Sequence, residues 1–266
     1  ISFILLGLPP AWWSAEYAEF YGGFSMLKAG MVFSDHVTTV SPTYAREICT
    51  PEFGYRFEGV LSALGDKLTG ILNGIDLDVW NPQTDEYIVQ NYSVDNNFIE
   101  GKFANKKDLL GRAGLAQGDA PLLGFVGRLV EQKGVDLITD MLPQLFENTN
   151  ANMVLLGSGH MAYETSLMDL AARYPERLHV HIGYSESLAH QIEAGADMFI
   201  MPSRFEPCGL NQMYSLRYGT PPVVNNTGGL ADTVVDVSLQ TLQDKTATGF
   251  VVKQADSETL YSTILN

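Results

Sequence analysis

The feature that most constrains the fold is an alternation of short apolar runs and amphipathic stretches from about Pro121 onward. The apolar runs are residues 121–127, 151–157, 178–183, 197–202, 221–225 and 249–252. Each is followed by a helix-like stretch; after the first run, Val135, Ile138 and Leu142 recur at helical spacing. Strands buried on both faces have continuous apolar sequences, and the intervening segments are long enough for crossover helices. The sequence therefore predicts an α/β fold with a doubly wound parallel sheet.

The first third of the chain is less regular. We expect a helix over residues 15–35, a strand over 36–41, a helix that begins at Pro42, and a strand over 67–72. Residues 73–82 are rich in turn formers, and charged, irregular sequence continues to about Lys107. A domain junction is expected near Asn73, which gives domains 1–72 and 73–266.

Composition narrows the class of partner. The 266 residues carry a formal net charge of −15, so a nucleic acid or an anionic membrane would be repelled. An anionic small molecule can still bind through a few local cations. Cys49 and Cys208 lie far apart in the sequence and fit free thiols in a reducing cytosol.

The two ends of the sequence resemble interruptions of domains. The start, "ISFILLGLPP", has no basic segment, and its apolar run is too short to span a membrane. The end, "SETLYSTILN", stops inside an amphipathic helix. The chain is therefore expected to be a fragment.

Arg128 and Lys133 lie in "GRLVEQKG", after one predicted strand and before a helix. Two cations at the carboxyl end of a strand, beside a helix N-terminus, favour an anion site. The alternative is a solvated surface pair. Gly228 and Gly229 in "NTGGLADTV" also precede a helix, where their backbone N–H groups can approach a phosphate; the alternative is that they allow tight packing.

"PSRFEPCGL" places Glu206 after another strand and Gly209 at the start of the next helix. An ionised carboxylate there can accept hydrogen bonds from sugar hydroxyls, and the alternative is a helix N-terminal cap. Cys208 is expected to be a packed thiol, because no histidine lies nearby in the sequence to act as its base.

No metal site is predicted. Asp76 and Asp78 form a DxD pattern in a turn-rich segment and are expected to be structural, and His179 and His181 alternate along a strand. CxxC, HExxH and GxSxG motifs are absent from the sequence.

The sequence resembles the bacterial glycogen synthases and plant starch synthases. The matching motifs are "LKAG", "TTVSPTYAREICTPEFGYRFEGVL", "GILNGID", "GRLVEQKG", "IGYSE", "PSRFEPCGLNQMYSLRYGTPPVV" and "TGGLADTV", in the family's order and over nearly the whole chain. The resemblance implies a fold of two Rossmann-like domains of the GT-B type. Residues 1–72 would be a remnant of the acceptor-side domain, and 73–266 the nucleotide-sugar-binding domain, truncated at its C-terminal end.

The resemblance also implies an activity: retaining transfer of glucose from ADP-glucose to the non-reducing end of an α-1,4-glucan, with no cofactor and no metal. Arg128 and Lys133 would stabilise the departing ADP, and Glu206 would hold glucose hydroxyls, so these three are the predicted catalytic residues. The predicted substrate-binding residues are Tyr184, beside the adenine, and Cys208, Gly209, Leu210, Thr227, Gly228 and Gly229.

The sequence departs from the family pattern at three places. The family's N-terminal lysine-glycine-glycine loop and its histidine in the catalytic cleft would lie before Ile1. Asn225 and Asn226 stand where an arginine is expected, and Tyr214 stands where related families have a second glutamate. The fragment is therefore expected to bind the donor but to be weakly active or inactive alone.

Two alternatives remain open at this point, a non-catalytic nucleotide-binding module and a related transferase that uses UDP-glucose. The expected partners are ADP-glucose or ADP and a glycogen or starch acceptor, without nucleic acid or membrane. The expected location is the cytoplasm, or the plastid stroma in a plant.

Overall fold

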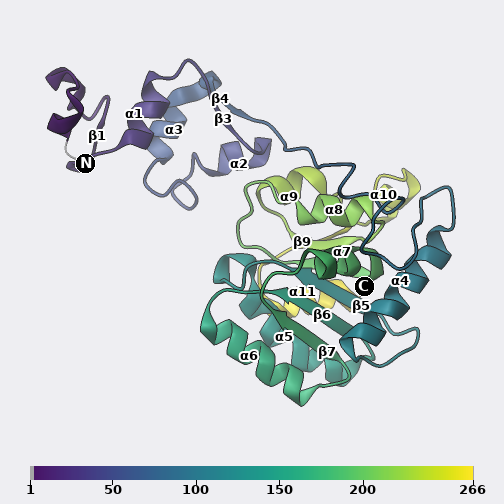
Figure 1. The fold of residues 1–266 in the computed structure, drawn as a ribbon. Coiled ribbons are helices and arrows are strands. Elements are labelled where there is room, and N and C mark those ends of the chain that lie inside the picture. The colour runs from purple at the N-terminus through teal and green to yellow at the C-terminus, as the bar shows by residue number, and fades with distance from the viewer. Residues whose placement is uncertain (1–2, 266) are drawn as a thin grey trace. The chain divides into compact units, whose positions relative to one another are not determined.

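The computed structural model describes residues 3–265. The chain divides into two compact units, Ile1–Asn73 and Gly74–Asn266. The second unit, dark blue through teal and green to yellow in Figure 1, contains the large sheet.

A six-stranded parallel sheet forms the centre of the second unit. Its strands are β5 (Leu122–Val126), β6 (Asn152–Gly157), β7 (Leu178–Ile182), β8 (Met198–Met201), β9 (Pro222–Asn225) and β10 (Phe250–Val252). Their order across the sheet is β10-β9-β8-β5-β6-β7. The chain thus adds β6 and β7 on one side of β5 and then returns to add β8, β9 and β10 on the other. The six predicted strands and the doubly wound α/β fold are confirmed.

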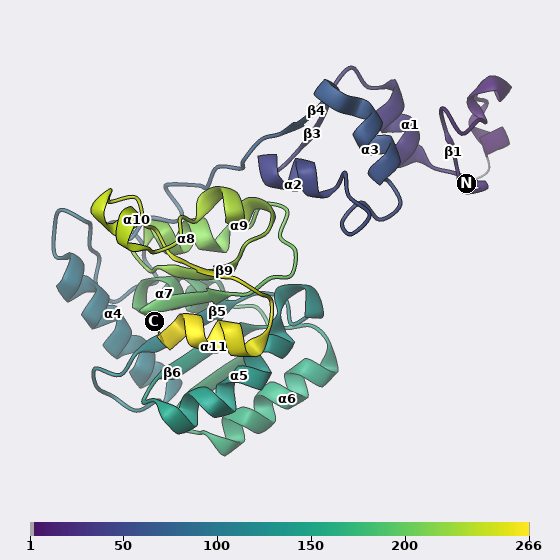
Figure 2. The same ribbon diagram turned by 180° about the vertical axis from the view of Figure 1, so that it is seen from behind.

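Helices cover both faces of this sheet. They are α4 (Phe98–Ala113), the 3₁₀ turn η4 (Glu131–Lys133), α5 (Val135–Asn148), α6 (Met161–Arg173), α7 (Glu186–Gly195), α8 (Asn211–Arg217), α9 (Gly228–Thr233), α10 (Leu239–Gln243) and α11 (Ser257–Leu265). Helices α5, α6 and α11 pack on one face, which is turned toward the viewer in Figure 2. Residues of α4, α7 and α9 pack on the other face.

Successive side chains of β5 enter the two cores in turn. Leu122 packs with α4 and α7, whereas Leu123 and Phe125 pack with α5. Because each strand residue faces one core or the other, the strand has no solvent-facing side and its sequence is continuously apolar. At Gly124, a Cβ atom would lie 2.5 Å from Cγ2 of Ile192, so glycine is what allows α7 to approach the sheet.

Asp197, just before β8, joins the two central strands. Its Oδ2 accepts hydrogen bonds from the backbone N of Leu122 at 2.7 Å and from Nζ of Lys106 at 2.6 Å. Its own backbone N donates to the Leu122 carbonyl at 2.8 Å. These bonds fix the register of β8 beside β5.

Within residues 3–73, the first unit contains two small sheets, three α-helices and three 3₁₀ turns. Its elements are η1 (Phe3–Leu6), η2 (Pro10–Trp12), β1 (Glu19–Phe20), β2 (Gly23–Phe24), α1 (Met26–Phe33), β3 (Val37–Thr39), α2 (Pro42–Glu47), α3 (Glu58–Leu64), η3 (Gly65–Lys67) and β4 (Leu68–Gly70). Strands β3 and β4 are parallel. The core of this unit is Met31, Ile48 and Leu61 with partly buried apolar neighbours.

The prediction of a helix over residues 15–35 is wrong for its first half. β1 and β2 form a hairpin there, and only α1 is helical. The turn between the strands needs positive φ at two successive residues, and Tyr21 (51°) and Gly22 (81°) provide it. Ser25 then accepts a hydrogen bond from the backbone N of Lys28 at 3.1 Å and starts the helix.

The prediction of irregular structure up to Lys107 is also wrong, because α4 begins at Phe98. Its buried face includes polar residues, so apolar periodicity does not reveal it. Asn105 is 4% exposed, and its side chain accepts from the backbone N of Val89 at 2.9 Å and donates to the Gln90 carbonyl at 2.7 Å. Hydrogen bonds to the preceding loop thus satisfy the amide.

Leu142→Ala tests the core between the sheet and helices α5, α6 and α11. Leu142 in α5 is fully buried, so the truncation should lower the free energy of unfolding by about 2–5 kcal/mol. Met161→Ala is the control, because Met161 is 80% exposed and its truncation should cost less than about 0.5 kcal/mol. Urea denaturation followed by circular dichroism gives both values. Equal losses in the two variants would contradict this core assignment.

Candidate functional site

Two loops meet beyond the carboxyl ends of β5 and β8, where the order of the strands in the sheet reverses. One follows β5 and contains residues 127–134, and the other follows β8 and contains residues 202–210. Because β5 and β8 are neighbours whose connections run to opposite sides, their carboxyl ends border a crevice. Arg128, Lys133 and Glu206, the three predicted catalytic residues, lie in these two loops.

Lys133 and Glu206 form an ion pair between the loops. Lys133 Nζ donates to Glu206 Oε2, which also accepts from Ser203 Oγ at 3.0 Å. The two side chains are 18% and 9% exposed, so the pair is shielded from water and stronger than a surface pair. Among the described residues, Oε1 of Glu206 has no hydrogen-bond donor and remains able to accept from a ligand.

These contacts decide between two interpretations of Glu206. Helix α8 starts at Asn211, and Leu210 is its N-cap residue. Glu206 lies four residues before that cap, and the side-chain contacts given above are with Lys133 and Ser203. The alternative of a helix cap is therefore wrong.

Arg128 is exposed, and its Nη2 donates to Oε1 of Gln132 at 3.0 Å. Gln132 Nε2 donates to the Phe205 carbonyl at 3.1 Å, and the Gln132 carbonyl accepts from the backbone N of Arg204 at 2.9 Å. Arg204 in turn binds Asp136 through both of its terminal nitrogens, at 2.7 and 2.5 Å. The two loops are thus joined by several hydrogen bonds besides the ion pair.

The predicted glycines lie against the Glu206 loop. A Cβ on Gly228 would be 1.9 Å from the Glu206 carbonyl oxygen, and one on Gly229 would be 2.1 Å from that of Cys208. The Gly229 N–H donates to the Glu206 carbonyl at 3.0 Å. These contacts support the packing interpretation of both glycines, and a contact of either with phosphate stays a prediction. Thr227, also predicted, is buried directly before them.

Cys208, Gly209 and Leu210 continue the same loop into α8. Cys208 is 4% exposed and is not in a disulfide, in agreement with a packed thiol. Gly209 has φ of 71°. Within residues 3–265, the backbone N–H groups of these three residues have no protein acceptor, and their donation to a ligand stays a prediction.

Tyr184 lies at the carboxyl end of β7, the outer strand of the same sheet, and is 83% exposed. Its hydroxyl donates to the Glu186 carboxylate. The structure therefore places Tyr184 along the same edge of the sheet as the two loops, at the far end from β10.

A buried network of polar side chains in the second unit was not predicted from the sequence. Asp85 Oδ2 accepts from the Tyr218 hydroxyl at 2.6 Å and lies 2.8 Å from Nδ1 of His190. Burial of Asp85 favours its neutral form, but the hydrogen bonds from His190, Tyr218 and the Tyr87 backbone outweigh burial and lower its pKa. The His190 ring stacks on Trp80 at 3.9 Å between centroids. Since 105 residues separate Asp85 from His190, spacing in the sequence gives no sign of the pair.

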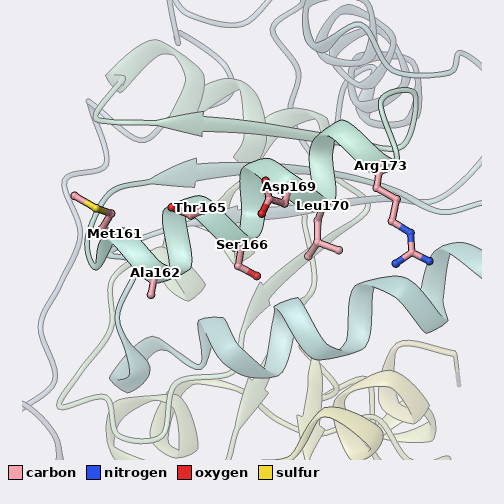
Figure 3. A pocket seen from close by; sticks show the side chains of 7 residues that line it. All are labelled: Met161, Ala162, Thr165, Ser166, Asp169, Leu170 and Arg173. Carbon is pink, nitrogen blue, oxygen red and sulfur yellow. The ribbon is translucent and has the colours of Figure 1, made fainter.

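A groove follows one side of α6. Figure 3 shows the side chains that line it, which are Met161, Ala162, Thr165, Ser166, Asp169, Leu170 and Arg173. The predicted site residues are not among them. Arg173 pairs with Glu147 at 3.7 Å, and both side chains are more than half exposed, so the groove has the character of an ordinary solvated surface.

Within the part of the chain that the structure describes, no group of three or more His, Cys, Asp or Glu side chains is arranged to hold a metal. Asp76 Oδ1 accepts from the backbone N of Asp78 at 2.9 Å and of Val79 at 3.0 Å, as expected for a structural turn. None of the helices in residues 3–265 combines the length and the apolar character needed to cross a membrane.

The sheet order and the charged crevice define the class: a doubly wound α/β protein with a polar site at its topological switch point. Residues 107–265 match the family described as "Glycosyl transferases group 1", and residues 2–63 match "Starch synthase catalytic domain". The chain belongs to the group 1 glycosyl transferases, in agreement with the resemblance noted in its sequence.

Named relatives agree with this family. The chain is 55% identical to a glycogen synthase of Hydrogenovibrio crunogenus over 98% of its own length and 55% of the relative. It is 52% identical to a glycogen synthase of Cellvibrio japonicus, covering 98% of the chain and 53% of the relative. It thus spans about half the length of these relatives.

A solved structure shares the fold. The catalytic domain of starch synthase IV from Arabidopsis thaliana, bound to ADP and acarbose, matches with a TM-score of 0.84 and 37% identity. The match covers 90% of this chain and 49% of that one.

Gly228→Ala tests the contact between α9 and the Glu206 loop. The new methyl group would collide with backbone, and φ at Gly228 is 46°, so the variant should lose about 1–3 kcal/mol of unfolding free energy. Gly111→Ala in α4 is the control: its nearest neighbour would be 3.8 Å away, so stability should stay equal or rise. If thermal melts show the same shift for both variants, the close contact is absent.

Asp85→Asn tests the buried network. Because the pKa of Asp85 is lowered in the folded state, its carboxylate stabilises the fold above its ordinary value of 3.8, and this contribution is lost as the pH falls through the folded pKa. The variant should therefore be less stable at pH 7, by about 1–3 kcal/mol, and the difference should shrink toward about pH 2. Urea titrations at several pH values measure it, with the exposed Asp119→Asn as control. A difference that does not depend on pH would contradict the role given to the Asp85 charge.

Proposed function

We propose that this chain is the donor-binding part of a glucosyltransferase that moves glucose from ADP-glucose to the non-reducing end of an α-1,4-glucan, with retention. The observation that carries the proposal is the shielded Lys133–Glu206 pair beside Arg128, at the switch point of the sheet. Residues 73–266 form the nucleotide-sugar-binding domain, and residues 1–72 belong to the acceptor side.

Arg128 and Lys133 bind the diphosphate. The chain has a net charge of −15, so an anionic ligand needs local cations, and the strand-end loop after β5 carries two of them. When the bond between glucose and phosphate breaks, negative charge grows on ADP and positive charge on the sugar. The two cations stabilise the growing negative charge in place and supply the countercharge without a metal.

Glu206 binds the sugar. Its Oε2 is held by Lys133 and Ser203, which orients Oε1 as an acceptor for glucose hydroxyls. The backbone N–H groups of Cys208, Gly209 and Leu210 belong to the same loop and donate hydrogen bonds to oxygen atoms of ADP-glucose. The ion pair fixes the Glu206 carboxylate before ADP-glucose binds, so the side chain loses little conformational freedom on binding.

Tyr184 packs against the adenine. Its ring is exposed at the carboxyl edge of β7, and the hydroxyl contact with Glu186 limits its rotation. The starch synthase that resembles this chain at 37% identity was solved with ADP and acarbose, and this pairing of a nucleotide with a glucan-like ligand supports the choice of donor and acceptor. A cytoplasmic location is part of the same proposal.

Calorimetric titration of the chain with ADP, and with UDP for comparison, tests this function. ADP should bind more tightly than UDP, and Arg128→Ala and Lys133→Ala should each weaken ADP binding by about 1–3 kcal/mol, the size of a lost charge-assisted hydrogen bond. Lys107→Ala removes an exposed cation from α4 and should leave the affinity unchanged.

Two outcomes would contradict the proposal. Equal binding of UDP would favour a transferase with a uridine donor. Failure of a folded sample to bind either nucleotide would mean that the crevice is not a working donor site. Binding of ADP without transfer to maltooligosaccharides would be consistent with donor binding and would locate the missing requirement on the acceptor side.

A further inference from the structure

The side-chain amide of Gln132 bridges the two loops of the crevice. Its Oε1 accepts from Nη2 of Arg128 at 3.0 Å, and its Nε2 donates to the Phe205 carbonyl at 3.1 Å. The backbone of the same residue accepts from the Arg204 N–H at 2.9 Å. Gln132 thus contacts a predicted diphosphate-binding residue on one side and the residue before Glu206 on the other.

The two partners fix the direction of the amide. A guanidinium group can only donate and a backbone carbonyl can only accept, so the oxygen must face Arg128 and the nitrogen must face Phe205. The arrangement needs one acceptor and one donor in a single side chain of this length. Glutamine supplies both, whereas glutamate lacks the donor and methionine lacks strong hydrogen bonding of either kind.

Arg128 needs such a partner because it is exposed. A free arginine side chain samples many rotamers, and part of this freedom is lost when it binds a phosphate. The bond to Gln132 holds the guanidinium in place beforehand, so less ordering is required when the ligand binds. Lys133 is instead ordered by Glu206 itself.

We propose that Gln132 is a positioning residue, which holds the Arg128 guanidinium in register with the Glu206 loop for binding of the diphosphate. This inference rests on the proposed function, since it assumes that Arg128 binds phosphate. Gln132 acts through Arg128, so its effect on nucleotide affinity should depend on the presence of that arginine.

A double-mutant cycle measured by ADP titration tests this dependence. Gln132→Met keeps the length and removes both hydrogen bonds, and it should weaken ADP binding about three- to tenfold. In the Arg128→Ala background the same change should weaken binding less than about twofold, because the group it positions is gone. Gln144→Met, an exposed glutamine on α5, is the matched control and should have no effect in either background.

The variant Gln132→Glu distinguishes a role in positioning Arg128 from a role in the stability of the whole fold. A carboxylate would pair with Arg128, reduce its net attraction for phosphate, and face the Phe205 carbonyl without a donor. We expect weaker ADP binding than in Gln132→Met at equal thermal stability. If Gln132→Met does not fold, the same cycle with Gln132→Ala, which also removes both hydrogen bonds and adds no charge, decides the question.

The outcomes distinguish the two levels of inference. If ADP binds and Arg128→Ala weakens it, but the Gln132 and Arg128 effects multiply, the positioning role is wrong and the proposed function stands. If ADP does not bind, or Arg128→Ala has no effect, the proposed function fails and the role of Gln132 fails with it. If Gln132→Met weakens ADP binding when Arg128 is present but not in the Arg128→Ala variant, both inferences are supported.

Discussion

The burial of β5 on both faces is the constraint on which the rest of the second unit depends. Leu122 faces one helical layer, and Leu123 and Phe125 face the other, so neighbouring strands and two layers of helices must cover it. The chain meets this requirement by building outward from β5 in both directions. One consequence is geometric: the connections after β5 and β8 leave toward opposite sides, and the space between them becomes the crevice that contains Arg128, Lys133 and Glu206.

The crevice carries positive charge, whereas the chain as a whole is acidic. The chain carries 31 acidic and 16 basic residues, yet the short loop after β5 carries Arg128 and Lys133 with only one acidic residue, Glu131, and faces the buried Glu206. Glu206 pairs with Lys133 and leaves Arg128 to Gln132, so each charged group has a fixed neighbour. Such prior ordering lets a ligand gain electrostatic stabilisation without a large cost in reorganising the protein. The donor site proposed above combines this crevice with the membership of the chain in the group 1 glycosyl transferases.

The sequence predicted the elements whose signals are local and apolar. The six strands and α5 follow from continuous or periodic apolar residues, and the helix at Pro42 follows from a proline suited to the first turn. The positions of Arg128, Lys133 and Glu206 after strands were also predicted, and their catalytic roles stay predictions. Local patterns failed where the structure depends on backbone geometry or distant partners. The hairpin at Tyr21 depends on positive φ, and α4 buries amides that the preceding loop satisfies. The contact between Gly229 and the Glu206 carbonyl, and that between Asp85 and His190, join residues that no spacing rule connects.

The pairing of β5 with β8 has a consequence for how the chain folds. Leu122 and Asp197, which bind each other at this junction, are separated by 75 residues, whereas β6 is the next strand after β5 in the sequence. During synthesis, β5, β6 and β7 emerge first and can form half of the sheet before β8 exists. Until β8 arrives, one edge of β5 presents unpaired backbone groups in a highly apolar strand, which is a template for pairing with another chain. The strand that organises the folded unit is thus also open to pairing with another chain while folding is incomplete.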